Sequence, residues 1–181
     1  MTACSAPGET RLRLRQLLAE APNDSPPRLL LDGDRIDAVA VPLGPGALPP
    51  AVRTTFDAIA PGGTTRFVGR ESSRRGDGYR VEKAYESSGT ASARSVLCTA
   101  NGEVLERWHS VPIADVPQAA AAAALRVAPV IDEARIVSGP TSEELWSFTL
   151  HDRIGWTFVV EVALDGRLLR RARQLAARVE S

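Results

Sequence analysis

A turn built from an Asx–Gly pair occurs three times in this chain, and it constrains the fold more than any other feature. The pairs are Asp32-Gly33, Asn101-Gly102 and Asp165-Gly166, and each lies between runs of apolar or alternating residues. Such pairs favour tight hairpin turns because glycine tolerates the positive φ that these turns require. Hairpins join neighbouring antiparallel strands. The sequence therefore predicts an antiparallel sheet in which most neighbouring strands are also neighbours along the chain.

Strand patterns fill most of the chain between these turns. Alternation of large and small or polar side chains is clearest from Tyr79 to Tyr85. The final segment, 167–179, fits a strand that runs into a helix. We expect a first hairpin over 28–42 and further strands over 67–71, 79–85, 95–99, 104–110, 130–138, 144–151 and 155–164.

Three segments have helical patterns. Residues 9–20 and 47–60 each place apolar residues on one face of a helix. The third begins at a predicted cap, Asp115, with Gln118 as its capping-box partner, and continues through six alanines, 119–124. Because alanine side chains are small, this helix can lie close to a sheet.

The order of helix, strands, Asx–Gly hairpin, linker and helix recurs along the chain, with successive turns 69 and 64 residues apart. We therefore expect an α+β fold, an antiparallel sheet of about eight strands built from two tandem helix-plus-sheet repeats, with the helices packed on one face. The first unit spans 45–113 and the second 114–181, and residues 1–44 form a helix and hairpin that read as a degenerate additional unit. The other face of such a sheet stays open.

The order and spacing of several short motifs resemble the PepSY-like family, which includes proteins shaped like the beta-lactamase-inhibitor protein. The resemblance covers roughly residues 45–175. The motifs are, in order, 48–52, 78–82, 100–105 and 116–119, and the second unit also matches through 146–148, 158–162 and 163–168.

The resemblance implies a binding or inhibitory module without catalysis. The chain departs from the family in carrying an extra N-terminal helix and hairpin and in showing no export signal, so we expect a cytoplasmic protein. Thr2 to Ser5 resembles the end of a lipoprotein cleavage site. The alternative is therefore an exported lipoprotein anchored to a membrane through Cys4.

Aromatic and charged side chains on the predicted open face are the candidate contacts to a partner. Trp108 shares a strand face with Glu106. Because an unpaired carboxylate is costly to bury, we expect this face to be solvated and Trp108 to be exposed, although a core position for each aromatic stays open. The predicted partner-binding residues are Tyr79, Lys83, Tyr85, Glu106, Trp108, Arg170 and Arg171.

No catalytic or metal-binding group can be assembled from the sequence. His109 and His151 each lie at a strand end beside charged residues, which favours solvated surface positions over general-base work. Cys98 lies in an apolar run and is predicted to be a small buried hydrophobe. Glu82 and Glu86 share one side of a strand, which is commoner for solvated carboxylates than for an acid–base pair. We expect no catalytic residue, no cofactor and no metal.

The balance of charges disfavours two classes of partner. The 22 basic and 22 acidic residues balance, which disfavours nucleic acid and a membrane surface as partners. The arginines between 167 and 178 form a solvated face or contact an acidic protein. We therefore predict a non-catalytic peptide- or protein-binding module, an inhibitor, regulator or accessory protein, that uses the open sheet face and can form a homodimer through its sheet edges. The alternative is a protein or enzyme that binds a small hydrophobic metabolite between helix and sheet.

Overall fold

The computed structural model of the chain describes residues 26–87, 90–140 and 142–176. The predicted helix over 9–20 and Cys4 lie outside these residues. Ten strands and two α-helices account for most of the described chain. The strands are β1 Arg28–Asp32, β2 Arg35–Pro42, β3 Thr64–Ser73, β4 Gly76–Ser87, β5 Thr90–Cys98, β6 Val104–Val111, β7 Val130–Ser138, β8 Leu145–His151, β9 Thr157–Ala163 and β10 Leu168–Ala176.

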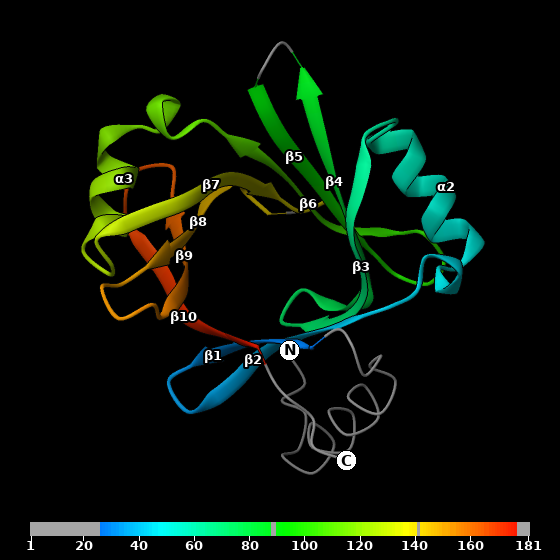
Figure 1. Cartoon of the computed structure of the whole chain (residues 1–181), viewed down its shortest axis with the longest axis horizontal. Coiled ribbons are helices and arrows are strands. Elements are labelled where there is room, and N and C mark those ends of the chain that lie inside the picture. Colours follow the sequence, from blue (N-terminus) through cyan, green and yellow to red (C-terminus); the bar gives the residue numbers. More distant parts are fainter. Residues whose placement is uncertain (1–25, 88–89, 141, 177–181) are drawn as a thin grey trace.

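All ten strands form one closed antiparallel barrel. Each strand pairs with the next along the chain, and β1 pairs with both β2 and β10. Leu29 lies opposite Val39 on one side and Leu175 on the other. Figure 1 shows the strands arranged as a ring. The expected α+β sheet of about eight strands is therefore wrong, because the N-terminal hairpin joins the last strand to the rest and closes the sheet.

Closure also corrects two other expectations. The description as tandem helix-plus-sheet repeats is wrong, since one continuous barrel contains all the described strands; the unit bounds 1–44, 45–113 and 114–181 stay predictions. The expected homodimer through sheet edges has no edge strand to use, because each described strand pairs with a neighbour on both sides over at least part of its length. The segment 167–179, whose structure the sequence left open, is a strand as far as Ala176.

Two helices cover the outside of the barrel. These are α2, Pro50–Ile59, and α3, Gln118–Leu125, each preceded by a short 3-10 turn, η1 Pro45–Ala47 and η2 Ile113–Asp115. The helices lie outside the ring on opposite sides (Figure 1). Asp115 belongs to η2, and the N-cap residue of α3 is Pro117, which makes no side-chain capping hydrogen bond. The predicted capping role of Asp115 is therefore wrong, and proline's fixed φ starts the helix instead.

Apolar side chains fill the layer between each helix and the barrel. Under α2, the buried Val52 and Phe56 belong to a core cluster with Val81, Val96 and Cys98. Under α3, three alanines contact a larger cluster that contains Phe148, Leu150, Val160 and Val162. Burial of large aliphatic and aromatic side chains stabilises each layer by about 1.5–3 kcal/mol per side chain. Both helix–sheet layers are therefore cores.

The inner face of the barrel has a different chemistry from the outer face. Along β4, Val81 and Lys83 face α2, whereas Arg80 and Glu82 line the interior. A barrel of ten strands is wider than the eight-stranded barrel whose interior side chains just fill it. Long charged side chains can therefore extend into this interior from several walls.

Three hairpin loops share one conformation. In each, the first residue donates its N–H to the carbonyl of the fifth, and the fourth residue, a glycine, donates back to the first. These glycines have φ values of 83°, 87° and 87°. The loops span 99–103, 152–156 and 163–167. Two of them contain predicted Asx–Gly turns, which confirms the hairpins at those positions.

Two of these glycines provide a matched test of helix packing. A Cβ on Gly166 would lie 3.0 Å from the Cβ of Ala119 in α3, whereas a Cβ on Gly155 would meet nothing within 4 Å. We expect Gly155→Ala to lower the free energy of unfolding by about 1–2 kcal/mol through backbone strain. Gly166→Ala should cost about 1–3 kcal/mol more because α3 must move. Urea denaturation measures both, and equal losses would contradict close packing of this loop against α3.

Candidate functional site

The barrel encloses a charged cavity of about 140 Å³ that is partly open to solvent. Its walls carry six arginines and five carboxylates, together with apolar side chains from several strands. The charged residues are Arg28, Arg74, Arg75, Arg80, Arg135, Arg170, Asp37, Glu71, Glu82, Glu106 and Glu161. This interior is the inner face of the sheet that the sequence predicts to be open, and closure encloses it instead.

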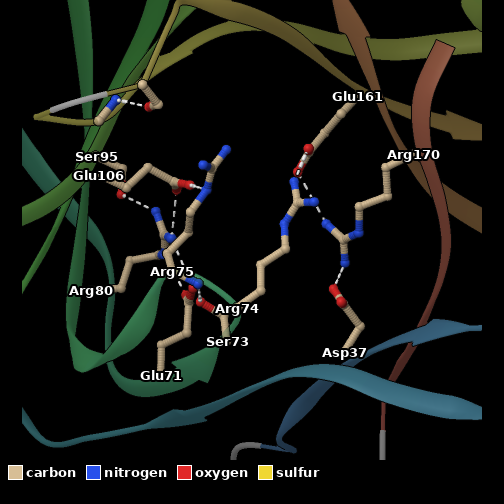
Figure 2. Close-up of polar contacts among 12 residues, drawn as sticks. Asp37, Glu71, Ser73, Arg74, Arg75, Arg80, Ser95, Glu106, Glu161 and Arg170 are labelled. Atoms are coloured by element: carbon tan, nitrogen blue, oxygen red, sulfur yellow. Dashed lines mark hydrogen bonds and ion pairs between the residues drawn. The ribbon is translucent and has the colours of Figure 1, made fainter. Parts of the chain in front are cut away.

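Arg80 is the centre of one group of ion pairs. Its guanidinium binds both carboxylate oxygens of Glu71, with Nη2 2.8 Å from Oε1, and Nη2 also lies 2.8 Å from Oε1 of Glu106. Nη1 donates to the hydroxyl of Ser95 at 3.2 Å. These residues come from four consecutive strands, β3 to β6, so the group ties one wall of the barrel together (Figure 2).

The β3–β4 turn connects this wall to the opposite one. Its two residues are Arg74 and Arg75. Arg75 Nε lies 3.2 Å from Oε2 of Glu106, and Arg74 forms an ion pair with Glu161 on β9. Figure 2 shows Arg74 extending between the two groups of charges.

Arg170 completes the second group. It contacts Glu161, with Nη1 3.0 Å from Oε1, and forms an ion pair with Asp37 of β2. The side chain of Arg170 is only 9% exposed. The first group lies on β3 to β6 and the second on β2, β9 and β10, and Arg74 in the β3–β4 turn joins them.

The buried guanidinium groups stay charged. Burial alone lowers the pKa of Arg80, but the charges and hydrogen bonds of Glu71 and Glu106 outweigh it and raise that pKa above its ordinary value. At Arg170, burial lowers the pKa, and Asp32 opposes the change. Because an arginine side chain has an ordinary pKa above about 12, both carry a positive charge at neutral pH.

Trp108 lies inside the barrel wall, so the expectation that it is exposed is wrong. Its side chain is 6% exposed and packs with Ala93, Val137 and Leu145. Arg135 lies over its ring, 4.2 Å from the centroid. Trp108 and Glu106 do share one face, as predicted, but that face is buried because Arg80 and Arg75 neutralise the carboxylate.

The remaining predicted partner-binding residues lie elsewhere. Tyr79 and Tyr85 pack in the α2 core, and the Tyr85 hydroxyl donates to the carbonyl of Ala60 at 2.9 Å. Lys83 Nζ lies 3.1 Å from Asp57 of α2 and over the ring of Phe56. Arg171 is exposed on β10. The structure therefore does not bring the seven residues to one surface, and their role in binding stays a prediction.

An exposed apolar patch occurs at one end of the barrel, and the sequence analysis missed it. Ile154 and Trp156, in the β8–β9 loop, are 74% and 48% exposed. Val130 of β7 lies opposite His151, the residue of β8 that directly precedes this loop. We call Ile154, Trp156 and Val130 the rim patch. The strand predicted over 155–164 includes Trp156, but the structure places Trp156 in the turn before β9, where side chains rarely reach a core; Trp146 and Phe148 on the adjacent strand are buried. Gly155 was the available signal for this turn.

Positive charge surrounds the rim patch. Arg126 and Arg153 are exposed and form no ion pair with any residue that the structure describes. Arg173 lies over the ring of Trp156, 4.2 Å from the centroid. The nearest carboxylates have other partners: Asp132 contacts His151 Nδ1 at 2.8 Å, and Asp152 accepts backbone N–H groups of its own loop.

The described residues show no assembled catalytic or metal centre. His109 is exposed, and the ring of His151 contacts the carboxylate of Asp132 through Nδ1. Within the same residues, no three histidine, cysteine or acidic side chains are placed to hold a metal ion. Cys98 is 1% exposed, which confirms its prediction as a buried hydrophobe. None of the described helices is long and apolar enough to cross a membrane.

The buried position of Trp108 predicts a large effect of its removal. Trp108→Ala should lower the free energy of unfolding by about 3–5 kcal/mol, because it removes a core aromatic and leaves a cavity. Trp156→Ala is the matched control and should cost about 1 kcal/mol or less, since that ring is half exposed. Chemical denaturation compares the two, and a small loss for Trp108→Ala would contradict its place in the wall.

The thiol of Cys98 should be unreactive in the folded chain. Burial raises its pKa to about 11, and the nearby Arg80 only partly opposes this. The thiol is therefore protonated at pH 8, and the thiolate is the reactive form. In a Cys4→Ser variant, labelling by a disulfide reagent at pH 8 should follow the unfolding rate. Rapid labelling of the folded variant would contradict burial.

Comparison with known proteins shows the fold and leaves the function open. No protein-family model matches the chain, and no curated protein is similar to it in sequence. A candidate periplasmic protein from Bacteroides eggerthii superposes with a TM-score of 0.52 and 15% identity, covering 71% of this chain and 90% of that one. A DUF2874 family protein from Bacteroides ovatus superposes with a TM-score of 0.49 and 15% identity, covering 70% of this chain and 88% of that one. A BLIP-like protein from Bacteroides fragilis superposes with a TM-score of 0.45 and 19% identity, covering 71% of this chain and 89% of that one. None of these descriptions names the PepSY-like family. The similarity to the B. eggerthii protein shows that the chain shares its fold.

Proposed function

We propose that this chain is a non-catalytic protein-binding module whose contact surface is the rim patch. The observation that carries the proposal is the exposure of Ile154 and Trp156 on a loop that the barrel holds in a defined conformation. Exposed apolar groups gathered at one place mark interaction sites on soluble proteins. Tryptophan and arginine are the residues most often found at the energetic centre of such contacts.

The charges around the patch define the partner. Arg126, Arg153 and Arg173 give the surroundings a positive sign, and two of them have no carboxylate partner among the described residues. A complementary partner presents an apolar pocket for Trp156 with acidic residues around it, since opposite charges steer association and fix orientation. The expected acidic protein partner is kept in this proposal, but its contact surface moves from the open sheet face to the rim.

A hydrophobic-metabolite protein is less well supported. The helix–sheet layers, where such a pocket was expected, are occupied by core side chains. A more open depression of about 430 Å³ includes Trp108 and His109, but arginines and serines from β5 and β6 line much of it. Tyr85 of β4 lines neither this depression nor the barrel cavity, and its hydroxyl donates to the carbonyl of Ala60 at the end of α2.

The cellular location belongs to the same proposal. The expected cytoplasmic location disagrees with the description of the B. eggerthii protein, which names the periplasm. We therefore favour the exported alternative, which the cleavage-like sequence around Cys4 suggested. Fractionation of cells that express the chain distinguishes the two locations.

Site-specific crosslinking tests the protein-binding function. A photoreactive amino acid at position 154 should crosslink to a protein partner in cells, and the same group at the exposed position 107 of β6 serves as the control. Once the partner is identified, its affinity for the purified chain is measured by calorimetry. Trp156→Ser should weaken binding by about 2 kcal/mol, roughly 30-fold, as loss of an interface aromatic does.

Charge reversal distinguishes a specific contact at the rim patch from nonspecific association. Arg153→Glu should weaken the same complex and abolish much of its salt dependence, whereas Arg107→Glu, on β6, should leave both unchanged. Circular dichroism confirms that each variant is folded. The proposal fails if position 154 crosslinks no protein, or if the crosslinked partner binds Trp156→Ser and Arg153→Glu as tightly as the unsubstituted chain.

A further inference from the structure

The strand β1 closes the barrel along only part of β10. It pairs with the end of β10, from Arg173 to Ala176, and then ends at Asp32. On its other side, β10 pairs with β9 from Leu168 onwards. Residues 168–172 therefore have β9 on one side, whereas on the other side no strand that the structure describes pairs with them. We call this stretch the β10 edge.

Unpaired backbone groups make the β10 edge a place where another strand can add. The backbone groups of an antiparallel strand alternate between its two sides, so about every second residue of this stretch directs its N–H and C=O toward the free side. Such an edge is a template for pairing with an extended peptide. A register shift between Leu168 and Arg170 leaves Leu169 without a partner on β9 as well. Bulges of this kind occur at barrel rims and beside binding sites.

Apolar side chains are exposed along the same edge. Leu168 and Leu169 are each 42% exposed, and Leu164, in the loop that precedes β10, is 54% exposed. Single exposed leucines are ordinary, but apolar side chains gathered on one hairpin beside an unpaired strand form a contact surface. The bound strand should therefore carry apolar side chains of its own.

The charge of β10 defines the rest of the partner. The strand contains three arginines, Arg170, Arg171 and Arg173, and no acidic residue. Arg170 contacts Asp37 and Glu161, whereas Arg171 is exposed and forms no ion pair among the described residues. A second copy of β10 would add more arginines beside these, and like charges on neighbouring strands are unfavourable. An acidic strand is favoured instead, because guanidinium groups pair well with carboxylates.

Leu168 and Arg171 project from the same face of β10. They lie opposite Val162 and Val160 of β9, and both valines belong to the core cluster under α3. Since partners directly opposite each other share a face, Leu168 and Arg171 are both on the outside of the barrel. A complementary strand therefore needs an apolar and an acidic side chain in turn along one face.

We propose that the β10 edge binds an extended, acidic and apolar peptide segment of another protein. The segment would pair antiparallel with β10 and continue the line of β1, with an apolar side chain on Leu168 and a carboxylate on Arg171. Backbone hydrogen bonds would supply much of the affinity, and these two side-chain contacts the specificity. The rim patch and the β10 edge lie beyond opposite ends of β9, so this proposal does not depend on the protein-binding surface proposed above.

Nuclear magnetic resonance on the full chain tests the proposal with a synthetic peptide. The probe is a blocked peptide of repeated Val-Val-Glu-Glu, which places valine and glutamate in turn along each face of an extended strand. The backbone amide signals of residues 168–172 should shift and saturate, and those on the free side should become protected from hydrogen exchange. The amide signals of β6 should stay unchanged. The same peptide N-methylated along its backbone cannot donate strand hydrogen bonds and should bind about 10-fold more weakly or less.

Charge reversal tests the role of Arg171. Arg171→Glu should weaken binding of the Val-Val-Glu-Glu peptide by about 10-fold or more, because it replaces attraction by repulsion. Arg107→Glu, at an exposed position of β6, is the matched control and should bind the peptide as the unsubstituted chain does. If Arg171→Glu does not fold, the comparison of the two peptides on the unsubstituted chain still decides the proposal.

Three results would overturn the proposal. These are the lack of a saturable shift at the β10 edge, equal binding of the two peptides, and a dimer in sedimentation that the peptide dissociates, since the edge would then pair with a second copy. Trp156→Ser separates the two proposed surfaces, because it should bind the peptide normally while losing the partner of the rim patch. Loss of one kind of binding without the other then shows which proposal has failed.

Discussion

The pairing of β1 with β10 is the constraint on which the rest of this molecule depends. Without it, β2 to β10 would form a curved sheet with one face against the helices and one face in water. With it, the second face becomes the wall of an enclosed space, and every side chain on that face must fit and be neutralised there. A closed barrel also satisfies the backbone groups of the two strands that would otherwise be edges.

Ion pairs are the means by which the interior accommodates its charges. Taking a charged group out of water costs several kcal/mol, and a buried pair recovers this only with good geometry and further hydrogen bonds. Arg80, with Glu71, Glu106 and Ser95 around it, meets that requirement. Such a group adds little net stability over an apolar core but penalises any shift in strand register, because a slip of one residue would move each partner to the other face. The charges therefore specify the barrel more than they stabilise it.

Closure also determines where the molecule can meet other molecules. The inner face is accessible only to small solutes, and the helices cover much of the outer face through filled apolar layers. The loops and helix ends at the two openings are what remains for a larger partner. The β8–β9 loop lacks the helix contact that its two equivalents have: a Cβ on Gly166 would meet α3 and one on Gly102 would meet α2, whereas Gly155 faces open space. The same loop conformation therefore serves packing in two places and exposes apolar side chains in the third.

Local sequence determined the elements of this protein well. Glycine at positive φ and alternating side chains located the hairpins, and the apolar spacing of Val52 and Phe56 located α2, because turn geometry and helix periodicity depend on residues a few positions apart. Tertiary structure alone decided which face of the sheet is enclosed. Glu106 and Trp108 were correctly placed on one face, yet that face is buried, since the partners of Glu106 come from β4 and from the β3–β4 turn. Closure of the barrel was equally invisible, because it joins Leu29 to Leu175 from opposite ends of the chain, and no local pattern records a contact over that distance.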